Sequence, residues 1–365
     1  MENRKIIIIG SGIGGLAAAI RMRMKGYQVE LFEKNSNPGG KISSLDMEGF
    51  RFDTGPSVFT LPGLAEELFI KAGYDPQVFF NVKSLQNTCR YFWKDGTVIN
   101  AYADKKSFER EASDKGLIKK GEIVSYLEKS EALYDLAAPV FVFSPFHRIK
   151  TFNSPAAKRI AARILKLDAF ASLHNRNNKS FADEKMVQLF DRYATYNGSD
   201  PYKAPATLKI IAHLEHNTGA WMLEGGMIKL VTALHELCKK TGVRIYYNTP
   251  VNEILIEKSE ARGIKTGKEI IKADYVISDA DVFSVYRKLL PGFQLPKRLK
   301  KAELSTSAMV FFWGMKGNFP QLDIHNIFFT ENYKQEFKCL FRERTISDNP
   351  TVYLYISSKI NKTDA

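Results

Sequence analysis

The pattern of apolar and polar positions is clearest at the start of the chain. Lys5 to Ile9 is a short β-branched run, which predicts a buried parallel strand. Leu16 to Gly26 is rich in helix formers and stops at a glycine, a common end of a helix. Tyr27 to Phe32 predicts a second strand. The order of strand, glycine turn, helix and strand predicts a βαβ unit.

Later segments predict further strands and helices. Asn87 to Ala103 predicts a hairpin, because two β-rich runs flank the turn-forming pair Asp95-Gly96. Lys105 to Tyr134 has a helical and heavily charged pattern. Met227 to Lys240 predicts a helix closed by Gly242. The remaining runs predict strands at Val243–Tyr247, Val251–Ile256, Tyr275–Ser278, Ala308–Trp313, Asn326–Thr330 and Val352–Ser357.

Leu136 to Leu167 is basic, with six Lys or Arg and no Asp or Glu. Pro139 and Pro145 argue against a long regular helix in its first part. Its second part predicts an amphipathic helix, with Ala157, Ile160, Ala161, Ile164 and Leu165 on one face and Lys158, Arg159, Arg163 and Lys166 on the other. Two interpretations stay open: a helix lying in an anionic membrane interface, or a surface helix packed on the core.

Composition narrows the class of protein. The chain has 365 residues, 44% hydrophobic and 25% charged, which is ordinary for a globular protein and enough for two domains. Its net charge of +13 favours an anionic partner, and without a zinc-finger or RNP-type motif we expect no nucleic acid. Three scattered cysteines and six unclustered histidines predict no metal site and a reducing compartment. We expect no transmembrane helix, and no signal peptide because glycines interrupt the stretch Ile6 to Ile20.

Glycines between the first strand and the helix follow the spacing GxGxxG at Gly10, Gly12 and Gly15, with Gly14 inside the motif. Such glycines permit the tight turn, the approach of a pyrophosphate and the packing of helix on strand. The pyrophosphate lies at the helix N-terminus, and an acid ending the second strand, here Glu33, accepts from the ribose hydroxyls. The motif predicts a dinucleotide site; a signal peptide or a chance glycine turn is the alternative.

Two further motifs distinguish FAD from NAD. Glu33-Lys34 is followed by Gly39-Gly40-Lys41, and FRFDTGPSVF then supplies Asp53 and the loop Gly55-Pro56-Ser57. Here the chain resembles the FAD-dependent amine oxidase and phytoene desaturase superfamily. The resemblance implies FAD as the cofactor, with Gly40, Lys41 and the Gly55–Ser57 loop beside it. Taken alone, Gly39-Gly40 is an ordinary turn and Asp53 an ordinary helix cap.

The block FDRYATYNGSDPYKAPATLKIIAHLEHNTGAWMLEGGM, residues 190–227, resembles bacterial carotenoid desaturases of the phytoene desaturase type. Within that family, TYNGSDPYKAP is most similar to hydroxycarotenoid 3,4-desaturases. The resemblance also implies that the backbone of Val251 holds the adenine, and that a loop at Asp279 and Ala280 returns to the FAD.

The expected fold is α/β. A Rossmann-like FAD-binding domain of the glutathione-reductase-like flavoprotein type takes residues 1–80 and 220–290. An inserted β-sheet substrate domain takes residues 81–103 and 291–365, and a helical, membrane-associated lid takes residues 104–219. The protein is expected to lie peripherally on the cytoplasmic side of a membrane.

The resemblance implies FAD-dependent desaturation of a membrane-dissolved carotenoid, by a 1-hydroxycarotenoid 3,4-desaturase or a phytoene or carotene desaturase. Arg163 lies near the place of a catalytic basic residue in relatives, with a membrane-facing role as its alternative. His213, Glu215 and Trp221 are candidates for lining the substrate chamber, although such a histidine is more often structural. Three alternatives stay open: a flavin amine oxidase, a carotenoid isomerase or saturase, and a non-catalytic flavin-binding protein.

Members of this family continue beyond the position of Ala365, with a glycine-rich stretch and a final helix that bind the flavin ring and pyrophosphate. We therefore expect the carboxy-terminal part to be missing. The residues present should contact the ADP half of FAD more completely than the flavin ring.

Overall fold

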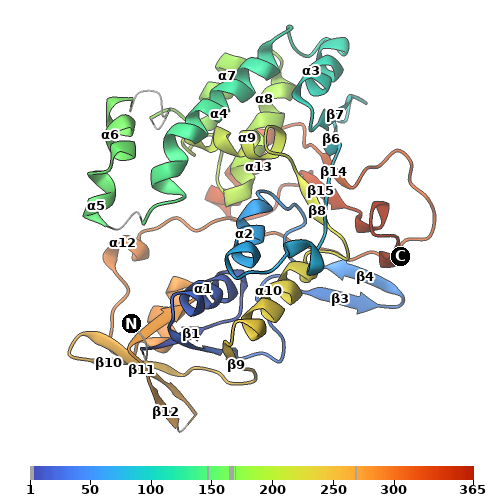
Figure 1. Ribbon diagram of the computed structural model, residues 1–365. Helices are drawn as coiled ribbons and strands as arrows, with labels where there is room; N and C mark the ends of the chain where they lie inside the picture. Colours follow the sequence, from blue (N-terminus) through green and yellow to red (C-terminus); the bar gives the residue numbers. More distant parts are fainter. Residues whose placement is uncertain (1–3, 146–147, 164–167, 169, 268) are drawn as a thin grey trace. The chain divides into compact units, whose positions relative to one another are not determined.

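The computed structural model describes residues 4–145, 148–163, 168, 170–267 and 269–365 (Figure 1). The chain divides into two compact units. Unit 1 consists of Met1–Lys83, Met222–Glu303 and Asn361–Ala365, and unit 2 of Ser84–Trp221 and Leu304–Ile360. The expected division into three parts stays a prediction.

A four-stranded parallel sheet forms the centre of unit 1, in the order β13-β1-β2-β9. Its strands are β1 (Lys5–Ile9), β2 (Gln28–Phe32), β9 (Arg244–Tyr246) and β13 (Tyr275–Ser278), and the accompanying helices are α1 (Ile13–Met24), α2 (Gly63–Lys71) and α10 (Ile228–Lys240). The apolar residues of β1 and β2 are buried because helices pack on the sheet, and Ile8, Leu16 and Leu234 belong to one core cluster. This is the predicted βαβ unit, and the predicted bounds of β1 and β13 are exact.

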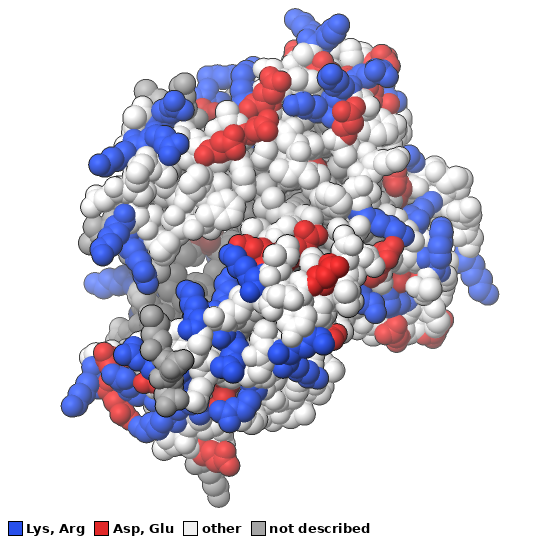
Figure 2. Space-filling view, viewed as in Figure 1, with Lys and Arg blue, Asp and Glu red and all other residues white. Residues whose placement is uncertain are grey.

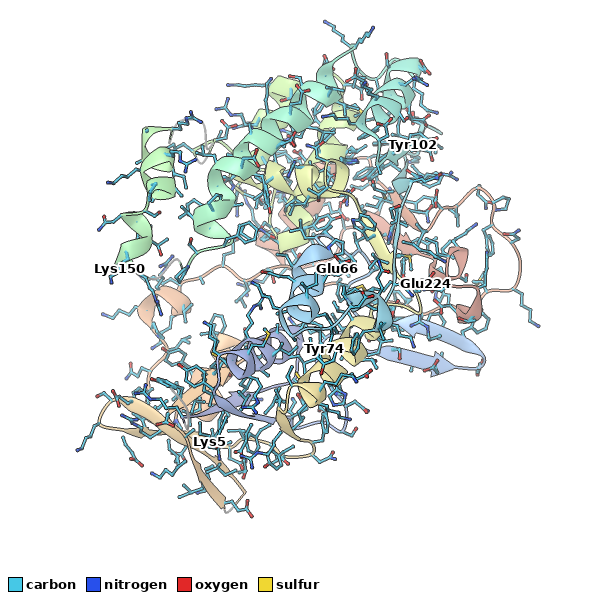
Figure 3. All side chains as sticks on the ribbon, in the orientation of Figure 1. Lys5, Glu66, Tyr74, Tyr102, Lys150 and Glu224 are labelled. Carbon is cyan, nitrogen blue, oxygen red and sulfur yellow. The ribbon has the colours of Figure 1, made fainter. Side chains whose placement is uncertain are left out.

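Smaller elements complete unit 1. They are the hairpin β3 (Ser44–Met47) and β4 (Phe50–Asp53), the antiparallel strands β10 (Glu253–Glu257), β11 (Glu260–Thr266) and β12 (Glu269–Lys272), and the short helices α11 (Val282–Ser284) and α12 (Lys297–Lys300). After α2, Tyr74 packs edge-on against Phe79 with ring centroids 5.9 Å apart (Figure 3). At the carboxyl end, Asp364 accepts from Arg51 Nε at 2.7 Å, which holds the last turn on unit 1.

Unit 2 combines a mixed sheet with helices. The sheet order is β15-β14-β6-β7, from β6 (Asn87–Phe92), β7 (Val98–Tyr102), β14 (His325–Phe328) and β15 (Val352–Tyr355). The helices are α3 (Lys105–Asp114), α4 (Glu122–Phe141), α5 (Ile149–Phe152), α6 (Pro155–Ala162), α7 (Leu173–Ser180), α8 (Glu184–Asp191), α9 (Ile210–His216) and α13 (Tyr333–Lys338). Large aromatic side chains fill the core, among them Tyr91, Phe108 and Phe190. Strands β5 (Val82–Ser84) and β8 (Trp221–Leu223) form a separate pair.

Two local predictions are wrong. Ala308 to Trp313 forms no strand, and Met309, Val310 and Phe311 are exposed. A β-rich run needs a pairing partner, and no described strand pairs with this one. The helix α4 also continues through Pro139 to Phe141. A proline removes one N–H donor and crowds the turn before it, and α4 ends two residues after Pro139.

Candidate functional site

The glycine loop lies at the carboxyl end of β1, where the chain turns into α1. Gly10 has a φ of +97°, in the left-handed region that favours glycine. A Cβ on Gly15 would lie 2.1 Å from the carbonyl oxygen of Gly10, so α1 packs this closely on the loop only with glycine there. Gly12 is the N-cap of α1 and offers no side chain to its free N–H groups. Those N–H groups are therefore available to an anion.

An anionic group occupies this helix terminus. The carboxylate of Asp279 lies against this turn, and the backbone N–H groups of Gly12 and Gly15 act to lower its pKa. A Cβ on Gly12 or Gly14 would lie 2.3 or 2.4 Å from its oxygens. Asp279 follows β13 and donates its own N–H to the Ile9 carbonyl at 2.9 Å. The carboxylate thus lies at the helix N-terminus, the place that the sequence prediction gave to the pyrophosphate of a dinucleotide.

Glu33 ends β2 and is only 5% exposed. Its Oε2 accepts from the N–H of Ser11 at 2.9 Å and from the Ser11 Oγ at 2.8 Å, and its Oε1 accepts from the N–H of Asn35 at 2.9 Å. These bonds hold the carboxylate beside the glycine loop. The sequence prediction did not include Ser11, although its place between the first two glycines was the available signal.

The second glycine motif packs directly on the first. Gly39 donates its N–H to the Ser11 carbonyl at 2.9 Å, and a Cβ on Gly40 would lie 3.4 Å from the Cα of Gly12. A Cβ on Gly55 would lie 2.4 Å from the carbonyl oxygen of Lys41, so the loop that carries Pro56 and Ser57 passes close to this turn. The structure thus brings together the glycine loop, the turn at Gly39–Lys41 and the loop at Gly55, which are separate in the sequence.

The other predicted cofactor residues also lie in unit 1. Val251 is half-buried and packs against a cluster that contains Ile9 and Phe32, the last residues of β1 and β2. Ala280 follows Asp279 and donates its N–H to Ser278 Oγ at 3.2 Å. Lys34 is exposed.

Asp53 acts as a helix cap, one of the two roles that the sequence left open. Its Oδ1 accepts from the N–H of Met227, at the start of α10, at 3.2 Å and from Arg51 Nη1 at 3.0 Å.

Glu215, a predicted substrate-chamber residue, lies in a buried polar cluster of unit 2. Its Oε1 accepts from Arg192 Nη2 at 3.0 Å and from Thr88 Oγ1 at 3.2 Å, and its Oε2 accepts from the hydroxyl of Tyr196. Burial alone would raise the pKa of Glu215. The electrostatic effects of Arg192 and His216, together with these hydrogen bonds, outweigh burial and lower the pKa to about 2. Glu215 is therefore a carboxylate at neutral pH.

Arg192 is the partner that the sequence prediction missed. Its guanidinium carbon lies 4.6 Å from the ring centroid of Tyr193, 5.2 Å from that of Tyr91 and 5.4 Å from that of Tyr196. Rings around a desolvated guanidinium add cation–π attraction to the ion pair. An arginine in the aromatic stretch FDRYATY was the signal for such a buried pair.

The remaining predicted substrate residues have other surroundings. His213 packs its ring on Tyr134, with centroids 4.9 Å apart, and its Nδ1 lies 2.9 Å from Asn217 Nδ2. Burial lowers the pKa of His213, so the ring is neutral at pH 7. Trp221 lies on β8 and is half-buried.

The amphipathic helix α6 packs its apolar face on α4. Ile160 is buried in a cluster with Leu133, Ala137 and Val140, which supports the interpretation as a packed surface helix. Its basic face, with Lys158, Arg159 and the C-cap residue Arg163, is exposed. The predicted members Ile164, Leu165 and Lys166 lie outside the described residues.

Exposed apolar side chains lie close in sequence to this basic face. Phe141 is 51% exposed, Phe143 57% and Phe152 50%. Figure 2 shows Lys and Arg separated by uncharged residues along the edge where Figure 1 draws α5 and α6. A basic and apolar surface of this kind suits an anionic lipid interface.

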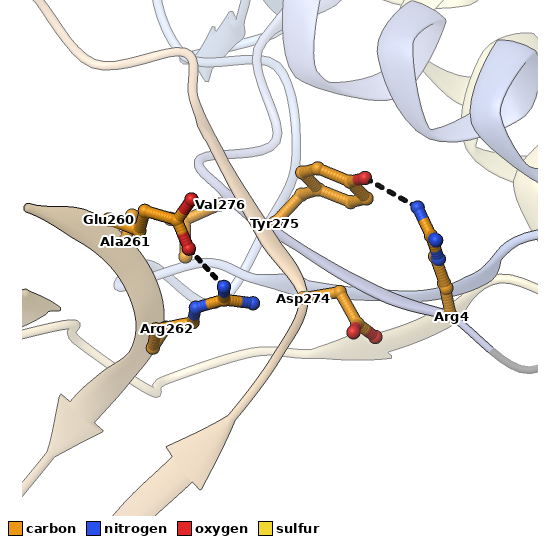
Figure 4. A pocket seen from close by; sticks show the side chains of 7 residues that line it. All are labelled: Arg4, Glu260, Ala261, Arg262, Asp274, Tyr275 and Val276. Atoms are coloured by element: carbon orange, nitrogen blue, oxygen red, sulfur yellow. Dashed lines mark hydrogen bonds and ion pairs between the residues drawn. The ribbon is translucent and has the colours of Figure 1, made fainter. Parts of the chain in front are cut away.

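A hollow of about 500 Å³ lies elsewhere in unit 1 (Figure 4). Its lining includes Arg4, Arg262, Asp274 and Tyr275, and Arg4 Nη1 donates to the hydroxyl of Tyr275 at 2.8 Å. Arg4 precedes β1 and Tyr275 begins β13, so this hollow lies at the amino ends of the parallel strands. Ligands of such sheets bind at the carboxyl ends, where the glycine loop lies.

The described residues contain no group of three His, Cys, Asp or Glu side chains able to hold a metal ion. Cys89, Cys238 and Cys339 are buried free thiols. A search of the helices in the described parts of the chain finds none that is both long and apolar enough to cross a membrane.

The chain matches one family model and is similar to several known proteins. The family model described as flavin containing amine oxidoreductase matches residues 13–357. The chain is 41% identical over 99% of its length to a 1-hydroxycarotenoid 3,4-desaturase of Flavobacterium sp. (strain P99-3), of which it covers 74%. It is 31% identical over its whole length to a 4,4'-diapolycopene oxygenase of Methylomonas sp., of which it covers 73%.

A solved structure of putrescine oxidase bound to putrescine has the same fold, with a TM-score of 0.52 and 17% identity over 82% of this chain. The chain covers only 62% of that protein, and thus spans less than two thirds of its length. A flavin-containing family confirms FAD, the cofactor predicted from the glycine motifs. The chain therefore belongs to the flavin containing amine oxidoreductase family, together with carotenoid desaturases.

Proposed function

We propose that this protein is an FAD-dependent desaturase of a membrane-dissolved carotenoid, and specifically a 1-hydroxycarotenoid 3,4-desaturase. The observation that carries the proposal is the 41% identity to such an enzyme over 99% of this chain. The glycine loop with Glu33 beside it supports an oxidoreductase that uses FAD, since the helix N-terminus at this loop favours an anion.

The residues that would hold FAD all lie in unit 1. The N–H groups of Gly12 and Gly15 would bind the pyrophosphate, Glu33 the ribose and the backbone of Val251 the adenine. Gly10 and Gly14 would shape the turn, and Gly40, Lys41 and the Gly55–Ser57 loop would lie beside the cofactor, as would Ala280. Bound FAD supplies the acceptor for the hydride equivalent that leaves the substrate.

The substrate requires an apolar surface, because a carotenoid has a long hydrocarbon chain. We assign its entry to the helical part of unit 2, where Phe141, Phe143 and Phe152 are exposed next to the basic face of α6. Arg163 is exposed on that face, which favours a role at the lipid surface over proton transfer. Residues 104–219 would then lie peripherally on a cytoplasmic membrane face.

The three predicted chamber residues, His213, Glu215 and Trp221, differ in how well they could contact the substrate. The side chains of His213 and Glu215 have protein partners and little exposure, so a supporting role behind the chamber fits them better. Trp221 is half-buried and is the stronger candidate for direct contact with the substrate.

A second candidate activity is oxygenation of a carotenoid end group, because the chain is 31% identical to a 4,4'-diapolycopene oxygenase. One experiment separates the two. The FAD-loaded protein is incubated with liposomes that contain a panel of carotenoids with and without a 1-hydroxyl group. A longer conjugated system from the hydroxylated substrates alone supports the proposal. Oxygenated products, or no reaction with any carotenoid, would refute it.

A further inference from the structure

Asp279 lies where the dinucleotide fold places the pyrophosphate of its ligand. The parallel register of β1 and β13 pairs Ile9 with Ser278, and therefore sets Asp279 beside the glycine loop. The side chain turns onto the loop: a Cβ on Gly12 would lie 2.3 Å from one carboxylate oxygen, and one on Gly14 would lie 2.4 Å from the other. The carboxylate thus occupies the space against the start of α1, where the backbone N–H groups would bind a pyrophosphate.

Two anions cannot share these donors. The carboxylate has to release the loop before the pyrophosphate binds, and its charge stays nearby afterwards because Asp279 is anchored by its backbone N–H to Ile9. The residue is exposed, so its side chain has room to turn away. Binding of the pyrophosphate therefore displaces the Asp279 carboxylate from the loop, and the two negative charges still repel each other afterwards.

We propose that Asp279 is an internal competitor for the pyrophosphate of FAD, which weakens the binding of dinucleotides and makes it depend on pH. The inference rests on the FAD site of the proposed function and not on the carotenoid. It changes the expected role of Asp279, from a residue that supports the cofactor to one that opposes it.

The pH dependence follows from the surroundings of the carboxylate. Partial loss of water around the carboxylate, where it lies against the loop, raises the pKa of Asp279, and the charge of Glu33 raises it further, whereas the backbone N–H groups of Gly15 and Gly12 lower it. Glu33 faces it from β2, and the first turn of α1 contributes no acidic side chain. The nearby Asp281 instead caps α11 through the N–H groups of Phe283 and Ser284. As the pH falls, Asp279 becomes protonated and stops competing, so the affinity for dinucleotides should rise.

The test measures binding of ADP and of FAD to the wild type, D279N and D279A by calorimetry, at about pH 8 and about pH 5.5. D281N is the matched control, because it removes one negative charge two residues away. We expect D279N and D279A to bind both ligands roughly 3- to 10-fold more tightly than the wild type at the higher pH. The difference should shrink at the lower pH, and D281N should behave like the wild type.

Equal or weaker binding by both variants would overturn the proposal, as would an equal gain in D281N. Circular dichroism of each variant checks that it is folded. Because ADP carries no flavin and no carotenoid is present, these outcomes do not depend on turnover. A failure to desaturate carotenoids would refute the proposed function and leave this binding result unchanged.

Discussion

At the scale of single residues, the glycine loop leaves no space for side chains at its tightest point. The Cβ of an alanine at position 15 would lie 2.1 Å from the Gly10 carbonyl oxygen, which is backbone and cannot rotate away. We expect G15A to push α1 off the loop and to weaken FAD binding by more than about 10-fold, because the N–H groups lose their alignment. Retention of FAD, measured by its absorption after gel filtration, checks this.

The matched control for that substitution is G63A at the start of α2. A Cβ there meets nothing within 4 Å, and the residue has no positive φ. It should bind FAD like the wild type. Normal FAD content in G15A would show that the loop does not form the cofactor site.

A second prediction at this scale concerns the buried ion pair of Glu215 and Arg192. Replacing Glu215 by Gln leaves the guanidinium of Arg192 buried without a counter-charge, and we expect a loss of about 3–5 kcal/mol in the free energy of unfolding. Denaturation with urea measures the loss. E67Q is the control, since Glu67 pairs with Lys71 at the surface, and we expect no measurable change.

The pH dependence of this difference follows from the lowered pKa of Glu215. In the folded protein its pKa is about 2, against an ordinary value of 4.5. The pair's stabilisation is therefore complete above the ordinary value and is lost as the pH falls toward the folded value. The difference between wild type and E215Q should shrink over that acidic range. A difference that stays constant would show that the charge of Glu215 is not what stabilises unit 2.

At the scale of elements, α6 has an apolar face covered by α4 and a basic face open to solvent. We expect the double charge reversal K158E/R159E to reduce binding to anionic liposomes by more than about 10-fold, at roughly 1 kcal/mol per basic residue near the surface. Co-sedimentation with liposomes measures it. Unchanged binding would refute a lipid-facing role of α6.

K119E/K120E is the matched control for that prediction. It reverses two adjacent exposed lysines just before α4 and changes the net charge by the same amount. We expect it to bind liposomes almost like the wild type. An equal loss in both double variants would indicate a general effect of charge.

The helices and strands also show which bounds the sequence could predict and which it could not. The bounds of β1 and β13 followed from short apolar runs, because both strands pair in one parallel sheet, and β1 is the more buried of the two. Pro139 was misleading because α4 continues for two residues past it before it ends at Phe141. Ala308 to Trp313 was misleading because a strand depends on a partner, which local composition does not reveal.

At the scale of the whole molecule, the sequence predicted the location of the candidate site better than the states of its side chains. The spacing of Gly10, Gly12 and Gly15 predicted the glycine loop. The second motif predicted a further cofactor segment, and its Gly39 bonds to this loop. The position of the Asp279 carboxylate depends on the register of two strands far apart in the chain. The pairing of Glu215 with Arg192 likewise depends on where the turn that follows α8 meets α9 in unit 2.

The family and the glycine loop together make flavin-linked oxidation the central claim, with a hydroxylated carotenoid as the proposed substrate. Mass spectrometry of the product from a 1-hydroxycarotenoid, after incubation with the FAD-loaded protein, tests that claim most directly. We predict a product that is lighter than the substrate by two hydrogen atoms and contains no added oxygen, and no such product from G15A. An unchanged carotenoid, or a product that gains oxygen without losing that hydrogen pair, would contradict the account.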